Sequence, residues 1–182
     1  MARARSLLDV DAAAAVGLLA FAASQSDVEA MRLLGRCLVD GRGIARDEPG
    51  GAVMIRAAAK QGHVEAMVDY ARLCLKGLGV EKAPAEAMEW LDCAARKGSL
   101  SALSALGMAY VEGIGVAASP EVGVAYLREA ATHGFAEAER ELGRCYDLGL
   151  GVERNPNEAR LFLESAARRG DVLARMLLDR LR

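Results

Sequence analysis

The chain has 182 residues, of which 53% are hydrophobic and only 4% aromatic, and its formal net charge is −2. A charge so close to balance argues against nucleic acid as the partner, because proteins that bind phosphate backbones carry a marked excess of Lys and Arg. The longest run without a charged residue, 12–26, is too short to span a membrane. The length fits a single domain, which we predict to cover residues 1–182.

The N-terminal region can be interpreted in two ways. Residues 1–10 and the apolar run after them resemble a secretory signal peptide, but Asp9 and Asp11 interrupt it, and the apolar core of such a peptide tolerates charge poorly. Residues 11–29 also fit half of the repeat described below, with Asp11 as the N-cap of a helix. We favour an N-terminal half-repeat cap in a cytoplasmic protein. A cleaved signal, with a periplasmic or secreted protein, is the alternative.

From residue 30 onward the sequence repeats every 36 residues without an insertion. The first position of the repeat is always alanine: Ala30, Ala66, Ala102, Ala138 and Ala174. Four full copies follow one another at 30–65, 66–101, 102–137 and 138–173. Residues 174–182 begin a fifth copy, which we expect to end the array as a C-terminal cap helix.

The first half of each copy predicts a helix. Its first, fifth and eighth positions are apolar, and this spacing places them on one helix face. The sixth position is small, as in Gly107 and Gly143, so a bulky residue there should overpack a helix contact. Two glycines with one residue between them, such as Gly41 and Gly43, then end the helix, because glycine adopts the left-handed conformation that a C-terminal cap requires.

The second half of each copy predicts another helix. Proline recurs where this helix should start, and Ser119 and Asn155 precede two of the prolines as expected N-caps. Large residues, an Ala-Ala pair and a closing glycine follow; the large residues are Met54, Trp90, Tyr126 and Phe162. Two departures lie near the N-terminus: Pro49 comes one place late, and Ser26 stands where the other copies have the closing glycine.

Each copy is therefore predicted to be a helical hairpin. One hairpin cannot bury its apolar face alone, whereas stacked copies share a continuous core. The predicted fold is all-α: a right-handed α-solenoid of antiparallel helix hairpins with a 36-residue period.

The pattern A-x-x-x-L-G-x-x-Y-x-x-G-x-G-V, followed by A-x-x-W/Y-L-x-x-A-A-x-x-G, resembles the Sel-1-like repeat, a relative of the tetratricopeptide repeat. The resemblance extends from about Ala12 to the C-terminus, with Leu38 where the family tends to have tyrosine. It implies a non-enzymatic scaffold or adaptor that binds another protein. Some members are linked to penicillin-type ligands, so a hydrolase is an alternative, although the sequence has no nucleophile–base motif.

Cysteine and histidine do not indicate a cofactor or a metal. The four cysteines, Cys37, Cys74, Cys93 and Cys145, form no C-x-x-C pair, and His63 and His133 fall in predicted turns. We expect buried, reduced cysteines and no catalytic, cofactor or metal site. Some secreted relatives join each hairpin by a disulfide, and a Cys74–Cys93 pair is the corresponding alternative here.

A column of arginines is the candidate partner-binding feature. The seventh position of the first helix lies off its apolar face and reads Arg36, Arg72, Met108, Arg144 and Arg180. First helices should line the concave side of such a solenoid, so these side chains are expected to form a ladder there, reinforced by Arg32 and Arg140. Apolar residues at nearby positions, Met67 and Leu75 among them, are expected to lie beside it.

This groove predicts a partner protein or peptide with acidic and apolar side chains. Arginine pairs bidentately with carboxylates, and methionine adapts to varied apolar surfaces. The alternative is an ordinary solvated face, since Asp40 and Glu112 dilute the positive charge. An exported envelope or virulence factor using the same groove is a further alternative.

Overall fold

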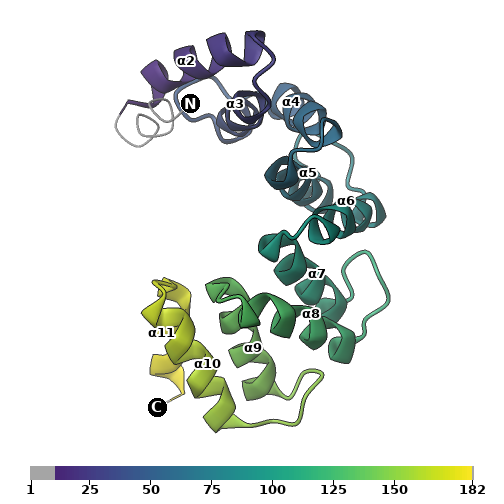
Figure 1. Cartoon of the computed structure of the whole chain (residues 1–182), viewed down its shortest axis with the longest axis vertical. Helices are drawn as coiled ribbons and strands as arrows, with labels where there is room; N and C mark the ends of the chain where they lie inside the picture. The colour runs from purple at the N-terminus through teal and green to yellow at the C-terminus, as the bar shows by residue number, and fades with distance from the viewer. Residues whose placement is uncertain (1–10, 182) are drawn as a thin grey trace. The chain divides into compact units, whose positions relative to one another are not determined.

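The computed structural model describes residues 11–181, and every regular element in that range is a helix (Figure 1). The all-α prediction is confirmed. Residues 1–10, where the signal-peptide interpretation begins, lie outside the described residues, as does Arg182. The chain divides into two compact units, residues 1–94 and 95–182.

The described part of unit 1, residues 11–94, contains four complete helices and most of a fifth. Their bounds are α2 Ala12–Ser24, α3 Val28–Asp40, α4 Glu48–Lys60, α5 Val64–Lys76 and α6 Pro84–Arg96. Unit 2 contains α7 Leu100–Glu112, α8 Pro120–Thr132, α9 Ala136–Leu148, α10 Pro156–Arg168 and α11 Val172–Arg180. Corresponding helices start 36 residues apart in the sequence, so the predicted period is confirmed.

The helix ends follow the predicted caps with one exception. Gly41 is left-handed, with φ +68°, and its N–H donates to the carbonyl of Cys37. The side chain of Asp11 accepts a hydrogen bond from the N–H of Ala14 at 3.0 Å, and Asn155 caps α10 in a similar way. Ser119 occupies the N-cap position of α8, but its side chain makes no capping hydrogen bond.

The second glycine of three turns, Gly43, Gly79 and Gly151, has a function that was not predicted from the sequence. A Cβ on Gly43 would lie 2.4 Å from the carbonyl oxygen of Ala12, the first residue of the second helix in the preceding copy. A Cβ on Gly79 would come equally close to the carbonyl group of Glu48, and a Cβ on Gly151 to the carbonyl group of Pro120. The turn of one copy therefore packs directly on the backbone of the copy before it, where only glycine fits.

Ser26 is the one non-glycine residue with a positive φ in residues 11–181. Its φ is +65°, whereas the corresponding Gly62 and Gly98 have φ of +90° and +86°. The half-repeat thus keeps the turn geometry of the full copies, with a residue that this conformation does not favour.

The two helices of a copy approach closely where the sixth position is glycine. A Cβ on Gly35 would lie 2.8 Å from the carbonyl oxygen of Gly51 in α4. Gly107 faces Gly123 of α8 in the same way, at 2.9 Å. The predicted large residues are half-buried, and the three aromatic ones pair with first-helix aromatics, as in Tyr146 and Phe162, whose ring centroids are 5.6 Å apart.

The four cysteines are unpaired in the structure, and Cys93 is the most exposed of them. Burial raises the pKa of the Cys145 thiol to about 11, so this side chain stays protonated and unreactive at neutral pH. Among residues 11–181, no helix has both the length and the apolar character needed to cross a membrane.

Two Gly→Ala substitutions should have opposite effects on stability. Gly107→Ala places a Cβ 2.7 Å from Cγ of Leu127, so we expect the free energy of unfolding to fall by about 1–3 kcal/mol. Gly17→Ala in α2 meets nothing within 4 Å and should raise it by about 0.5–1 kcal/mol through the better helix propensity of alanine. Urea unfolding followed by circular dichroism measures both changes. A Gly107→Ala variant as stable as wild type would contradict the close-contact explanation.

Candidate functional site

The arginines predicted to form one ladder fall into two groups. Arg32, Arg140 and Arg144 are partly or fully buried and bonded to carboxylates of neighbouring helices. Arg36, Arg72 and Arg180 are exposed, and none of them has an ion pair within residues 11–181. Helix position alone therefore does not determine which arginines are available to a partner.

In unit 1, Arg32 of α3 is 7% exposed and joins α3 to α5. Its guanidinium donates to Glu29 at 2.8 and 3.0 Å, and to Asp69 of α5 at 2.7 Å. Glu29 in turn lies 2.9 Å from Nε2 of His63, whose Nδ1 accepts the N–H of Ala66 at the start of α5. Arg32 thus has a structural role between two neighbouring copies.

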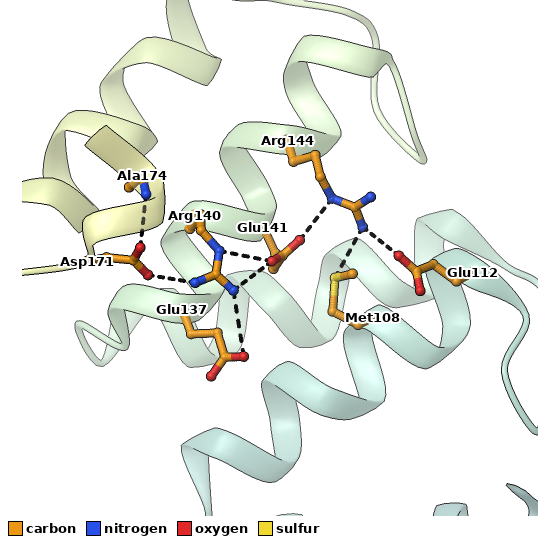
Figure 2. A network of polar contacts seen from close by, with 8 residues as sticks. All are labelled: Met108, Glu112, Glu137, Arg140, Glu141, Arg144, Asp171 and Ala174. Carbon is orange, nitrogen blue, oxygen red and sulfur yellow. Dashed lines mark hydrogen bonds and ion pairs between the residues drawn. The ribbon is translucent and has the colours of Figure 1, made fainter. Parts of the chain in front are cut away.

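Unit 2 contains a longer network (Figure 2). Arg140 of α9 bonds Glu141 at 2.8 Å and Asp171 at 2.8 Å, and Asp171 also caps α11 by accepting the N–H of Ala174. Arg144, one turn further along α9, bonds Glu141 and also Glu112 of α7, each at 2.9 Å. These two arginines therefore tie α9 to the helices on both sides of it.

The pKa values of the buried arginines reflect these bonds. Burial alone would lower the pKa of Arg32, but its hydrogen bonds to Glu29 and Asp69 outweigh that cost and raise the pKa above its ordinary value. Burial would also lower the pKa values of Arg140 and Arg144, but their interactions with carboxylates, mainly with Glu141, outweigh it and raise both pKa values. These guanidiniums are permanently charged, and their charge is already neutralised by carboxylates within the protein.

Most of the apolar residues expected beside the ladder are in the core. Met67 is 3% exposed, so the expectation that it lies on the surface is not met. Val39 and Leu103 are also buried, and Val39 packs against Gly51 in the second helix of its own copy. Leu75 and Met108 remain partly exposed, and the sulfur of Met108 lies 3.5 Å from a guanidinium nitrogen of Arg144.

The open part of the predicted site lies in unit 1, between α3 and α5. A cavity of about 240 Å³ is lined there by the exposed cations Arg36, Arg72 and Lys76. Asp40 and Asp69 also line it, but Asp69 is already bonded to Arg32. Apolar side chains complete the lining: Val39, Ile55, Leu73 and Leu78.

This cavity combines an apolar floor with three cations and one uncommitted carboxylate. Such a surface is suited to a partner group that carries negative charge next to apolar atoms. Within residues 11–181, no three His, Cys, Asp or Glu side chains gather in a way that could hold a metal ion.

The sequence analysis missed the carboxylates that hold the buried arginines. Glu29 and Glu141 each precede an arginine by three residues, a spacing that favours an ion pair on one helix and could have been recognised. Asp69 lies in the copy after that of Arg32, and Asp171 lies at the far end of the copy that contains Arg140, so only the folded arrangement of the helices brings each pair together.

The two groups of arginines should respond differently to mutation. Arg32→Met removes the shared partner of Glu29 and Asp69, and we expect a loss of about 3 kcal/mol in the free energy of unfolding. Arg72→Met changes an exposed side chain and should alter it by no more than about 0.5 kcal/mol. Urea unfolding of both variants measures the difference. Equal costs would contradict the division into structural and available arginines.

Comparison with known proteins identifies the repeat. The Sel1 repeat family matches four consecutive segments, residues 28–63, 64–99, 100–135 and 136–171. Each match begins two residues before the copy boundaries predicted from the alanine column, at the first residue of a first helix. No curated protein is similar enough to count as a match.

Several solved structures share the fold. A Sel1 repeat protein from Oxalobacter formigenes has 28% identity and a TM-score of 0.85, over 95% of this chain and 71% of its own. A protective antigen of uropathogenic Escherichia coli has 27% identity and a TM-score of 0.76, over 92% of this chain but only 36% of its own. An immunity protein from Pseudomonas aeruginosa has 26% identity and a TM-score of 0.66, over 88% of this chain and 58% of its own.

Proposed function

The chain belongs to the Sel1 repeat family, and from that premise we propose that it is a non-enzymatic adaptor or regulator that binds a partner protein through its first helices. Scaffolds of this family generally mediate protein–protein interaction. The observation that carries the proposal is the cavity between α3 and α5, where Arg36, Arg72 and Lys76 are exposed and have no ion pair within residues 11–181.

The chemistry of this cavity favours a protein partner over a reaction. An arginine guanidinium presents donors in a fixed fork that matches a carboxylate, and the apolar floor can take a neighbouring aliphatic side chain. The cavity has cations and carboxylates but no candidate nucleophile beside a base, so it does not support the hydrolase alternative. Turnover of an acyl ester by the purified protein would restore that alternative.

The partner can be identified by affinity capture from an extract of the native cells. Wild type is compared with Arg36→Glu/Arg72→Glu and with a matched control, Lys60→Glu/Lys82→Glu, which changes the net charge equally at two exposed lysines outside the cavity. We expect wild type and the control to recover the same protein and the arginine variant to lose it.

The recovered partner is then purified and titrated calorimetrically. We expect its affinity to fall as salt is added, because exposed ion pairs are screened. Equal recovery by all three proteins would place the binding surface elsewhere on the molecule. Failure of wild type to bind any protein specifically would contradict the adaptor function itself.

An immunity role is a second candidate, favoured by the similarity to the immunity protein from Pseudomonas aeruginosa over most of this chain. It is a special case of partner binding in which the partner is a toxin. Expression of the captured partner without this protein tests it: a toxic partner supports the immunity role, and a harmless one supports an adaptor.

We propose a cytoplasmic location, on the basis of four unpaired cysteines in the structure. The exported alternative makes a different prediction for the native protein. Alkylation after unfolding without reductant should modify all four cysteines of a cytoplasmic protein, and mass spectrometry should find an uncleaved N-terminus. A Cys74–Cys93 disulfide or a processed N-terminus would favour the exported alternative.

A further inference from the structure

The repeat relates the cavity of unit 1 to a corresponding place in unit 2, two copies further along the chain. Arg72 of α5 corresponds to Arg144 of α9, and Asp40 of α3 corresponds to Glu112 of α7. Asp69 and Arg36 likewise correspond to Glu141 and Met108. The two places can therefore be compared residue by residue.

In unit 2 the guanidinium of the corresponding arginine, Arg144, is bonded to carboxylates of the protein itself. Glu112 and Glu141 each bond Arg144 at 2.9 Å, and Met108 contributes an uncharged thioether beside it (Figure 2). The guanidinium of Arg144 thus has two carboxylates, one from its own helix and one from α7, the first helix of the preceding copy.

In unit 1 the same arrangement is incomplete. Both carboxylates are aspartates, one methylene shorter than the glutamates of unit 2, and Asp69 is bonded to Arg32 at 2.7 Å. Arg36, in place of Met108, adds a second cation to the cavity lining. As a result, Arg72 has no ion pair within residues 11–181 and remains exposed.

We propose that unit 1 is a carboxylate receptor: it binds a glutamate side chain of an acidic partner segment at Arg72, as Glu112 binds Arg144 in unit 2. This inference rests on the proposed function and specifies the ligand of the same cavity. Arg36 and Lys76 provide the remaining positive charge, and Leu78 at the cavity contacts an apolar residue next to that glutamate.

The excess of positive charge in this cavity is also expected to lower the stability of the fold. Arg36, Arg72 and Lys76 line one cavity with Asp40 as its one uncommitted carboxylate, and the excess of like charge opposes folding. Replacing Arg36 with the methionine of unit 2 should therefore leave stability unchanged or raise it while it weakens binding. This opposite response of stability and binding separates a recognition residue from a structural one.

The test uses the full-length protein and a fluorescein-labelled octapeptide of alternating glutamate and leucine, with a glutamine-for-glutamate octapeptide as the matched probe. Fluorescence anisotropy should show that wild type binds the glutamate peptide at least about tenfold more tightly. Inorganic phosphate is added as a competitor. Competition at equal concentration would overturn the carboxylate assignment in favour of a phosphate group.

Two variants exchange the residues of the units. Arg36→Met/Asp40→Glu gives unit 1 the residues of unit 2 at two of the three positions that differ, and we expect it to lose binding about tenfold or more without losing thermal stability. Met108→Arg/Glu112→Asp makes the reverse change at the same two positions of unit 2, and we expect a second peptide to bind there. Failure of wild type to bind the glutamate peptide at millimolar concentration, or unchanged binding by the first variant, would overturn the proposal.

The outcomes also separate this inference from the proposed function. Peptide binding with the expected pattern, but no partner in the capture experiment, would support the receptor and contradict the adaptor. A captured partner that Arg36→Met/Asp40→Glu still binds fully would support the adaptor and contradict the receptor.

Discussion

Close contact between the two helices of a copy is the constraint on which the rest of each unit depends. Where Gly107 faces Gly123, the backbones of α7 and α8 approach so closely that neither position has room for a Cβ. That distance brings the aromatic pair Tyr110 and Tyr126 into stacking contact, with ring centroids 5.7 Å apart. Packing of this density transmits small changes, so the glycine contacts of α3, α7 and α9 help to position the arginines that α3 and α9 carry.

Features that depend on one residue and its place in the repeat were predictable from sequence. The helices, the left-handed glycine caps and the N-cap of Asp11 belong to this class, because their causes are local. The state of each arginine was not predictable, because it depends on a residue in another copy and on the length of its side chain. Arg72 and Arg144 share a column, but Arg144 bonds Glu112 and Glu141, whereas the aspartates near Arg72 are shorter and Asp69 is bonded to Arg32.

One sequence position therefore serves two purposes in the same protein. In unit 2 the arginine of this column stabilises the stack, since Arg144 joins α9 to α7 through Glu112. In unit 1 it lines a cavity with surplus positive charge. Repeat proteins are stabilised mainly by contacts between neighbouring copies, so one copy can give up an ion pair while the others maintain the stack. The ion pair of Arg144 in unit 2 thus shows the arrangement that we would expect for Arg72 in unit 1 if its only role were to stabilise the fold.

The turn glycines also bear on how such a chain can change in length. Gly43 and Gly79 each lie against the first residue of a helix in the preceding copy, with no space for even one additional carbon. A single inserted or deleted residue between these points would misplace that contact in the copy concerned. Removal or duplication of an entire copy would preserve the contact between each turn glycine and the helix start of the copy before it. Arrays built in this way are expected to evolve in steps of whole repeats, and engineered arrays should be lengthened by the same unit.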